Sequence, residues 1–163
     1  MGRRAEALAD RIEQGAAGLA AFAEGLSEAD WDRPISAGGA DRRTIGVIVH
    51  HVAFVYPIEV DIAKKIAGGQ AALDVTLEGI AEMNANHARE NSAVTKAAAL
   101  EFLRRNAREA AARVRQFTDE ELDQAAPFGL AFGAPVTAQF VVEDHALRHS
   151  WHHLARIRKT LGH

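Results

Sequence analysis

Apolar residues recur at helical spacing along almost all of this 163-residue chain, and this periodicity limits the possible folds more than any other feature. In the first segment, 3–26, Leu8, Ile12 and Leu19 fall on one face of an amphipathic helix. Similar patterns predict helices over 44–67, 74–90, 95–117 and 137–161, with 74–90 the short or broken one. The strand-like run QFVVE continues a helical pattern, so we predict an all-α fold: a four-helix bundle with a short extra helical segment.

Cap and turn residues delimit the predicted helices. Ser27 is suited to N-cap a single turn, Thr118 and Glu121 match a capping box, and the glycine pair at 38–39 marks a loop. The segment APFGLAFGAP is also a predicted loop because of its glycines and prolines. Pro57 lies inside the second helix, where its missing N–H and its ring predict a kink.

Composition excludes several classes of protein. With 48% hydrophobic and 25% charged residues, the chain can form a single domain over 1–163, and no repeat or linker divides it. Nineteen basic and 22 acidic side chains leave a net charge of −3, which is too balanced for a surface that binds nucleic acid or an anionic membrane. Charges at 6, 10, 11 and 13 interrupt any signal peptide, and the apolar run 47–58 is too short to cross a bilayer. We therefore expect a cytoplasmic protein.

The chain contains no cysteine, so any metal site has to use His, Asp or Glu. Four of the eight histidines lie within nine residues near the C-terminus. At about 100° per residue, His149 and His153 fall in the apolar stripe of the last helix and point inward, whereas His145 and His152 project toward the boundary or solvent and are weaker ligand candidates. On the second helix, His51 occupies the middle of the apolar stripe. Three imidazoles from two helices are thus predicted to face one interior.

An i,i+4 histidine pair presents two nitrogens that one metal ion can bridge, and His51 is the candidate third ligand. Such a three-histidine site would hold zinc, nickel, iron or manganese with a coordination position open for water or substrate. The alternative is that each histidine is an ordinary core residue satisfied by a carbonyl or a serine. A buried imidazole left without a partner costs about 1–3 kcal/mol, and this cost favours a shared ion.

The histidine segments also resemble a known family. TIGVIVHHVA and HSWHHLARIRKTLG are similar to the two histidine motifs of the DinB/YfiT-like superfamily of metal-binding four-helix bundles, and MNANHARENS and the segment from Phe117 to His149 resemble its connecting regions more weakly. The resemblance implies that His51, His149 and His153 are the metal ligands. It also implies an up-down-down-up bundle with a long central connection and, commonly, a homodimer. Phe54 stands where many members carry an acidic residue, so no role of that carboxylate is transferred.

The resemblance implies more than one activity, since some members look like thiol-dependent S-transferases or isomerases and others like metal-dependent hydrolases. Our leading interpretation is an enzyme that transfers a low-molecular-weight thiol to a small molecule, because a divalent ion stabilises a thiolate at neutral pH. Hydrolysis by an activated water is the alternative, with Glu59, about two turns after His51, as the candidate base; the other interpretation of Glu59 is a boundary residue or a salt-bridge partner. A third interpretation is a non-catalytic binding or stress-associated protein in which the metal is structural or absent.

Several other side chains have two possible roles. Asn84 could orient a ligand or close a helix-end hydrogen bond, and Arg148 and Arg156 could meet an anionic substrate or stay solvated. Trp151 is predicted to contact another helix or a second subunit. The loop PFGLAFGAP could line a hydrophobic ligand pocket.

Overall fold

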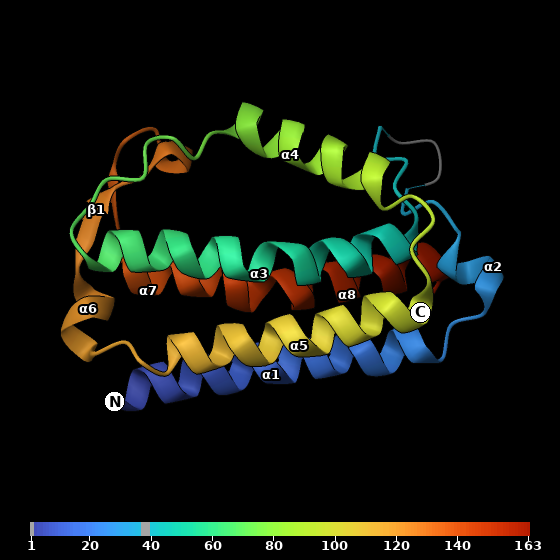
Figure 1. Ribbon diagram of the computed structural model, residues 1–163, viewed down its shortest axis with the longest axis horizontal. Coiled ribbons are helices and arrows are strands. Elements are labelled where there is room, and N and C mark those ends of the chain that lie inside the picture. The colour runs from blue at the N-terminus through green and yellow to red at the C-terminus, as the bar shows by residue number, and fades with distance from the viewer. Residues whose placement is uncertain (1, 37–39) are drawn as a thin grey trace.

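Four long helical segments form the body of the computed structural model, which describes residues 2–36 and 40–163 (Figure 1). The segments are α1 (Arg3–Glu24), α3 (Ile45–Ala67), α5 (Lys96–Val114) and a final one made of α7 (Ala138–Val141), a π-helical turn (Val142–Leu147) and α8 (Arg148–Leu161). Figure 1 shows α3 and α5 running opposite to α1, and the last segment running parallel to it. This is the predicted up-down-down-up bundle. The loop predicted at 38–39 lies outside the described residues.

Shorter helices connect these segments, and threonine or serine side chains cap them. Ser27 caps α2 (Glu28–Trp31), and Thr118 caps α6 (Asp119–Asp123) in a capping box with Glu121, as predicted. The extra helix, α4 (Leu77–Glu90), begins three residues later than the predicted 74 because the Thr76 side chain accepts a hydrogen bond from the backbone N–H of Gly79. In Figure 1, α4 lies alongside α3 on the side away from α1 and α5.

The segment APFGLAFGAP, predicted as a loop, includes parts of a short β-hairpin that the sequence did not reveal. There, β1 (Ala125–Pro127) and β2 (Pro135–Thr137) form an antiparallel hairpin around a 3₁₀ turn, η1 (Gly129–Ala131). Strands of three residues are too short to show an alternating pattern, and a proline in each hides them further. Ala72, just before α4, exchanges backbone hydrogen bonds with Pro127 and Gly129 at 2.9 and 3.0 Å, so the hairpin anchors the chain that leads into α4.

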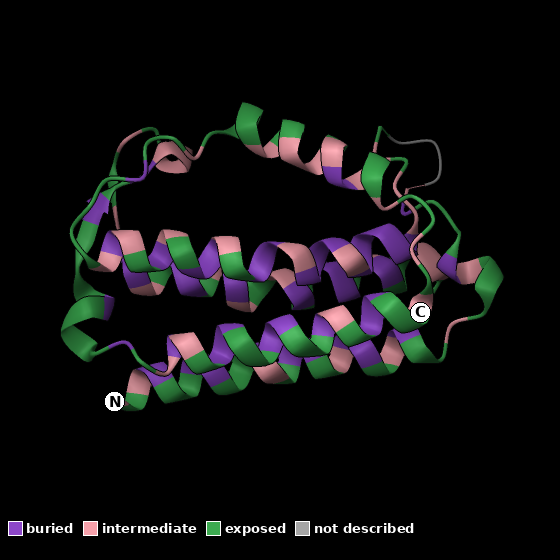
Figure 2. Cartoon of the chain, in the orientation of Figure 1, coloured by how far each residue is buried: buried purple, intermediate pink, exposed green. Residues whose placement is uncertain are grey.

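The helix α3 lies at the centre of the fold. It is longer than the apolar run 47–58, and by length and composition it could cross a membrane, but 67% of its most apolar window is buried within the bundle. In its first nine residues, 45–53, every residue but His50 is buried. Figure 2 shows purple, buried residues along α3 and alternating buried and exposed residues along α1 and α5. The burial is that of a core helix in a helical bundle.

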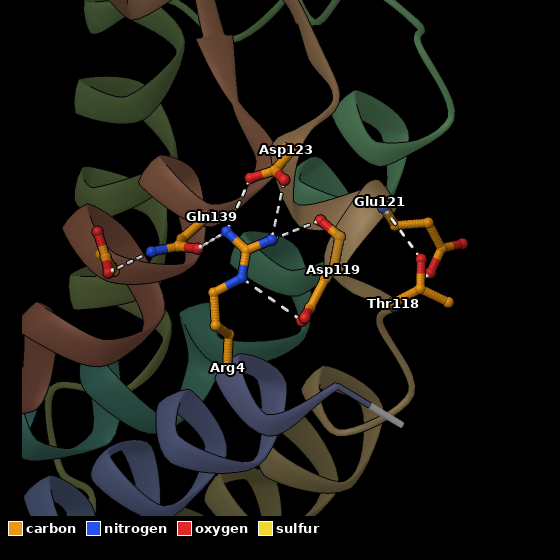
Figure 3. Close-up of polar contacts among 7 residues, drawn as sticks. Arg4, Thr118, Asp119, Glu121, Asp123 and Gln139 are labelled. Atoms are coloured by element: carbon orange, nitrogen blue, oxygen red, sulfur yellow. Dashed lines mark hydrogen bonds and ion pairs between the residues drawn. The ribbon is translucent and has the colours of Figure 1, made fainter.

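A polar clamp fixes the N-terminal end of α1 (Figure 3). The Arg4 guanidinium donates hydrogen bonds to Asp123 at 2.7 Å, to the backbone carbonyl of Asp119 at 2.7 Å and to Gln139 at 3.1 Å. These contacts are largely exposed and contribute little to stability. They nevertheless fix how α1 meets α6 and α7.

Pro57 does not end α3, because a side chain from α5 replaces the hydrogen bond that proline removes. The carbonyl oxygen of Ala53, four residues earlier, would normally accept a hydrogen bond from the N–H of residue 57. Instead, the buried Asn106 donates its Nδ2 to that oxygen at 2.8 Å. The helix therefore continues through Pro57 as a single element, and the kink stays a prediction.

We expect the Asn106→Ala variant to lose about 2 kcal/mol of unfolding free energy, because it leaves the buried carbonyl of Ala53 without a donor. In a Pro57→Ala background the same substitution should cost less, since residue 57 then supplies its own N–H. Urea denaturation of the four proteins measures this coupling, with exposed Arg108→Ala as the control on the same helix. Equal costs in both backgrounds would contradict the assignment.

Candidate metal centre

The three histidines singled out in the sequence meet in space. His51 comes from α3 and His149 and His153 from α8, and one ring nitrogen of each lies within 4.8 Å of the other two. His51 and His153 are buried, and His149 is half-buried. The Nε2 atoms of His149 and His153 face each other at 2.9 Å. The geometry is the predicted one, and metal ligation by these three residues stays a prediction.

The π-helical turn before α8 interrupts the regular spacing used to place the histidines. The angle of about 100° per residue does not hold within Val142–Leu147, which contains His145. His149 and His153 both follow this turn and belong to the regular α8, so their i,i+4 relation is preserved. The pair was therefore correctly placed, although the helix around it is not uniform.

A buried carboxylate orients one ring of the cluster. Glu59, two turns after His51 on α3, is only 6% exposed, and its Oε1 lies 2.6 Å from His149 Nδ1. A proton on Nδ1 donated to this oxygen leaves the lone pair of His149 on Nε2, which faces His153. Carboxylate–histidine pairs of this kind fix the tautomer and orientation of metal-binding histidines. Sequence reasoning considered Glu59 as a base, a boundary residue or a salt-bridge partner, but did not pair it with His149. Its signal was an acidic residue within a largely buried helix.

The other two rings have the protonation state that a metal ligand requires. Burial lowers the pKa of both His51 and His153, and the neighbouring His149 lowers them further, so both are neutral at pH 7. Among the described residues, neither Nδ1 atom has a hydrogen-bond partner. No ring of the cluster bonds to a backbone carbonyl or a serine in that part of the chain, contrary to the alternative of ordinary core histidines. The three rings and Glu59 fit a divalent cation.

A second histidine contact, which the sequence did not reveal, attaches α4 beside the cluster. His87 is the buried residue of α4, and its Nε2 lies 2.8 Å from His50 Nδ1. Its ring centroid is 5.6 Å from that of His51. Burial lowers the pKa of His87 to about 4, so this ring is also neutral at pH 7. Finding this contact from the sequence would have required knowing which side chains of the segment MNANHARENS face α3.

A cavity of about 710 Å³ opens beside the cluster and is lined by residues from α3, α4, α8 and the hairpin. Its walls include all three cluster histidines, and also His145 and His152, which lie outside the cluster as predicted. Leu130 comes from the segment predicted to line a ligand pocket. Further lining residues taken from the sequence analysis are Glu59, Asn84, Arg148 and Arg156. The volume is in the range typical of small-molecule sites.

Trp151 is not part of this cavity. A Cβ placed on Gly15 of α1 would lie 2.7 Å from the indole nitrogen of Trp151, so the ring packs against another helix as predicted. It is nevertheless 40% exposed. Its contact with a second subunit stays a prediction.

The bundle topology and the histidine cluster define a helical protein with a candidate metal centre between its second and fourth long segments. The chain belongs to the DinB superfamily, whose family model matches residues 11–157. Its fold is similar to that of YfiT from Bacillus subtilis, with a TM-score of 0.74 and 18% identity over 98% of this chain and 87% of that one. YfiT is described as a probable metal-dependent hydrolase with an unusual four-helix bundle topology. Among curated proteins, none matches this chain.

Proposed function

We propose that this protein is a divalent-metal-dependent enzyme that acts on a small molecule, and that it transfers a low-molecular-weight thiol. The observation that carries the proposal is the cluster of His51, His149 and His153, two of them neutral and buried, on the wall of a cavity of about 710 Å³. A structural metal site would be closed by a fourth protein ligand. Within the described residues the cluster has three members, which leaves room for an exchangeable ligand.

The surroundings of the cluster favour thiol transfer over hydrolysis. A divalent cation bound there supplies Lewis-acid activation, which stabilises a thiolate without a protein base. Hydrolysis often uses a carboxylate base, yet the three aspartates that line the cavity are ion-paired and Glu59 already binds His149 through its Oε1. In the transfer, the thiol sulfur forms a bond to carbon, the leaving group departs with the bonding electron pair, and the thiol proton leaves with it. The sulfur comes from the cosubstrate because the chain has no cysteine.

One observation supports hydrolysis as the second candidate. Glu59 Oε2 is buried and has no hydrogen-bond partner among the described residues, so it could accept a proton from water. YfiT, whose fold is similar, is described as a probable metal-dependent hydrolase. A homodimeric, cytoplasmic protein stays our prediction for either activity.

The two activities can be separated with model substrates. Zinc-, nickel-, iron- and manganese-loaded protein is assayed with a thiol and an activated aryl halide, and separately with a p-nitrophenyl ester without thiol. We expect thiol transfer to exceed ester hydrolysis, and His51→Ala to reduce it by at least about 100-fold, since three ligands are the minimum found in catalytic zinc sites. His163→Ala, at the exposed C-terminus, is the control. Ester hydrolysis alone would favour the second candidate, and neither activity would favour a binding protein.

A further inference from the structure

One end of the cavity carries an excess of positive charge. Asp41 accepts hydrogen bonds from Nε and Nη2 of Arg43 at 2.9 and 2.8 Å, and another from Nη2 of Arg156 at 2.9 Å. The hydrogen bond from Arg43 holds the pKa of Asp41 well below its usual range, so this carboxylate is ionised. Two guanidinium groups therefore share one negative charge, and one positive charge is left over.

The other charged groups around the cavity lie away from this end or are paired. Three acidic side chains on its wall form ion pairs, Asp61 with Arg113, Asp74 with Lys65 and Asp144 with Arg148. The fourth, Glu59, contacts His149, so its negative charge lies at the histidine cluster. The excess of positive charge is thus confined to the end of the cavity formed by Arg43 and Arg156.

A buried donor at this end has no acceptor. Arg43 Nη1 is inaccessible to solvent and has no hydrogen-bond partner in the described part of the chain. Asn84 Oδ1, from α4, is also buried and has no hydrogen-bond partner among the described residues. Arg43 and Asn84 both line the cavity and an adjoining hollow beside α4. Rotating the Asn84 amide by half a turn would present a second donor. A buried guanidinium N–H without an acceptor is costly, and a bound anion would supply one.

The position of this charge relative to the histidines and the apolar wall suggests how a ligand lies. Arg43 precedes α3, His51 follows within it, and Val55, Ile58 and Ile62 continue the cavity wall toward its C-terminal end. Arg43 and the three cluster histidines line the same cavity. The cluster therefore lies between a cationic end and an apolar wall.

We propose that Arg43, together with Arg156, binds a carboxylate group of the substrate, and that the substrate is an amphipathic small molecule whose apolar part lies along α3. The inference rests on the proposed function, since it assigns a substrate class to the same site. Arginine suits this role because its N–H groups form charge-assisted hydrogen bonds with carboxylates. A molecule held in this way presents its central atoms to the histidine cluster.

Calorimetric titration of chelator-treated protein with octanoate and octanamide tests the inference without any metal. Octanoate should bind more tightly than octanamide. The Arg43→Gln substitution should weaken the binding of octanoate by about tenfold or more and leave the binding of octanamide unchanged. Arg156→Gln should act in the same direction to a smaller extent, and it keeps the test informative if Arg43→Gln does not fold. Arg148→Gln removes the same charge from the same cavity, but from an arginine already matched by Asp144, and should leave octanoate binding unchanged.

Octanoate binding that is insensitive to both Arg43→Gln and Arg156→Gln would overturn the inference. Repeating the titration with zinc-loaded protein separates this failure from failure of the proposed function. Octanoate that binds only the zinc-loaded form, independently of Arg43, would be a metal ligand, and the inference would fail while the metal centre stands. Arginine-dependent octanoate binding to a protein that takes up no metal would uphold the anion subsite and refute the proposed function.

Discussion

The His153→Ala variant should contain almost no divalent metal, whereas the unmodified protein, purified without a tag, should contain about one ion per chain. Removing this ring leaves two protein nitrogens, which cannot hold an exchangeable ion at the affinity of a three-histidine site. We choose His153 because its polar contact is with His149, so the pairing of His149 with Glu59 survives the substitution. Elemental analysis measures the metal, and circular dichroism verifies that the helices remain.

His152→Ala provides a matched control for metal content. His152 is the preceding residue of the same helix, but it is exposed and lies outside the cluster, so its removal should leave the metal content unchanged. If neither the parent nor the variants take up zinc, nickel, iron or manganese, the cluster is a hydrogen-bonded histidine network and not a metal centre. Loss of metal in both variants would place the ion elsewhere on α8.

The three cluster histidines could be predicted because each lies in a regular helix, where spacing alone determines the direction of a side chain. His149 and His153 needed only their i,i+4 relation. His51 needed one further step, the assumption that apolar stripes of two helices face each other. The π-helical turn did not disturb this reasoning because it lies entirely before His149.

Contacts that depend on how helices are shifted and rotated against each other could not be predicted. The pairing of Glu59 with His149 depends on the axial offset between α3 and α8, which no local pattern encodes. The contact of His87 with His50 requires the path of a long connection. The hairpin was missed because its strands are too short to display a period. Sequence periodicity thus predicts which residues face inward, and tertiary packing decides which of them meet.

The second large effect is expected from the Glu59→Gln variant. This substitution should lower metal affinity without lowering the stability of the metal-free protein. Glu59→Gln keeps an oxygen that can accept the proton of His149 Nδ1 but removes the negative charge. Carboxylate partners of metal-binding histidines typically contribute 10- to 100-fold to metal affinity, so we expect a loss of about that size with one ion still bound. Glu59→Ala, which also removes the hydrogen bond, should lose more. Competition with a chromophoric chelator measures both, with the exposed Glu109→Gln as control.

The stability of the metal-free proteins distinguishes an orienting role from a purely structural one. Glu59 is buried, and its Oε2 has no hydrogen-bond partner among the described residues. Burying a charged group costs folding free energy. Replacing it with neutral glutamine should leave the unfolding free energy of the metal-free protein unchanged or raise it, while metal affinity falls. A residue that only supports the fold would lower both together. Unchanged metal affinity in Glu59→Gln would show instead that the charge of Glu59 does not act through His149 on the metal.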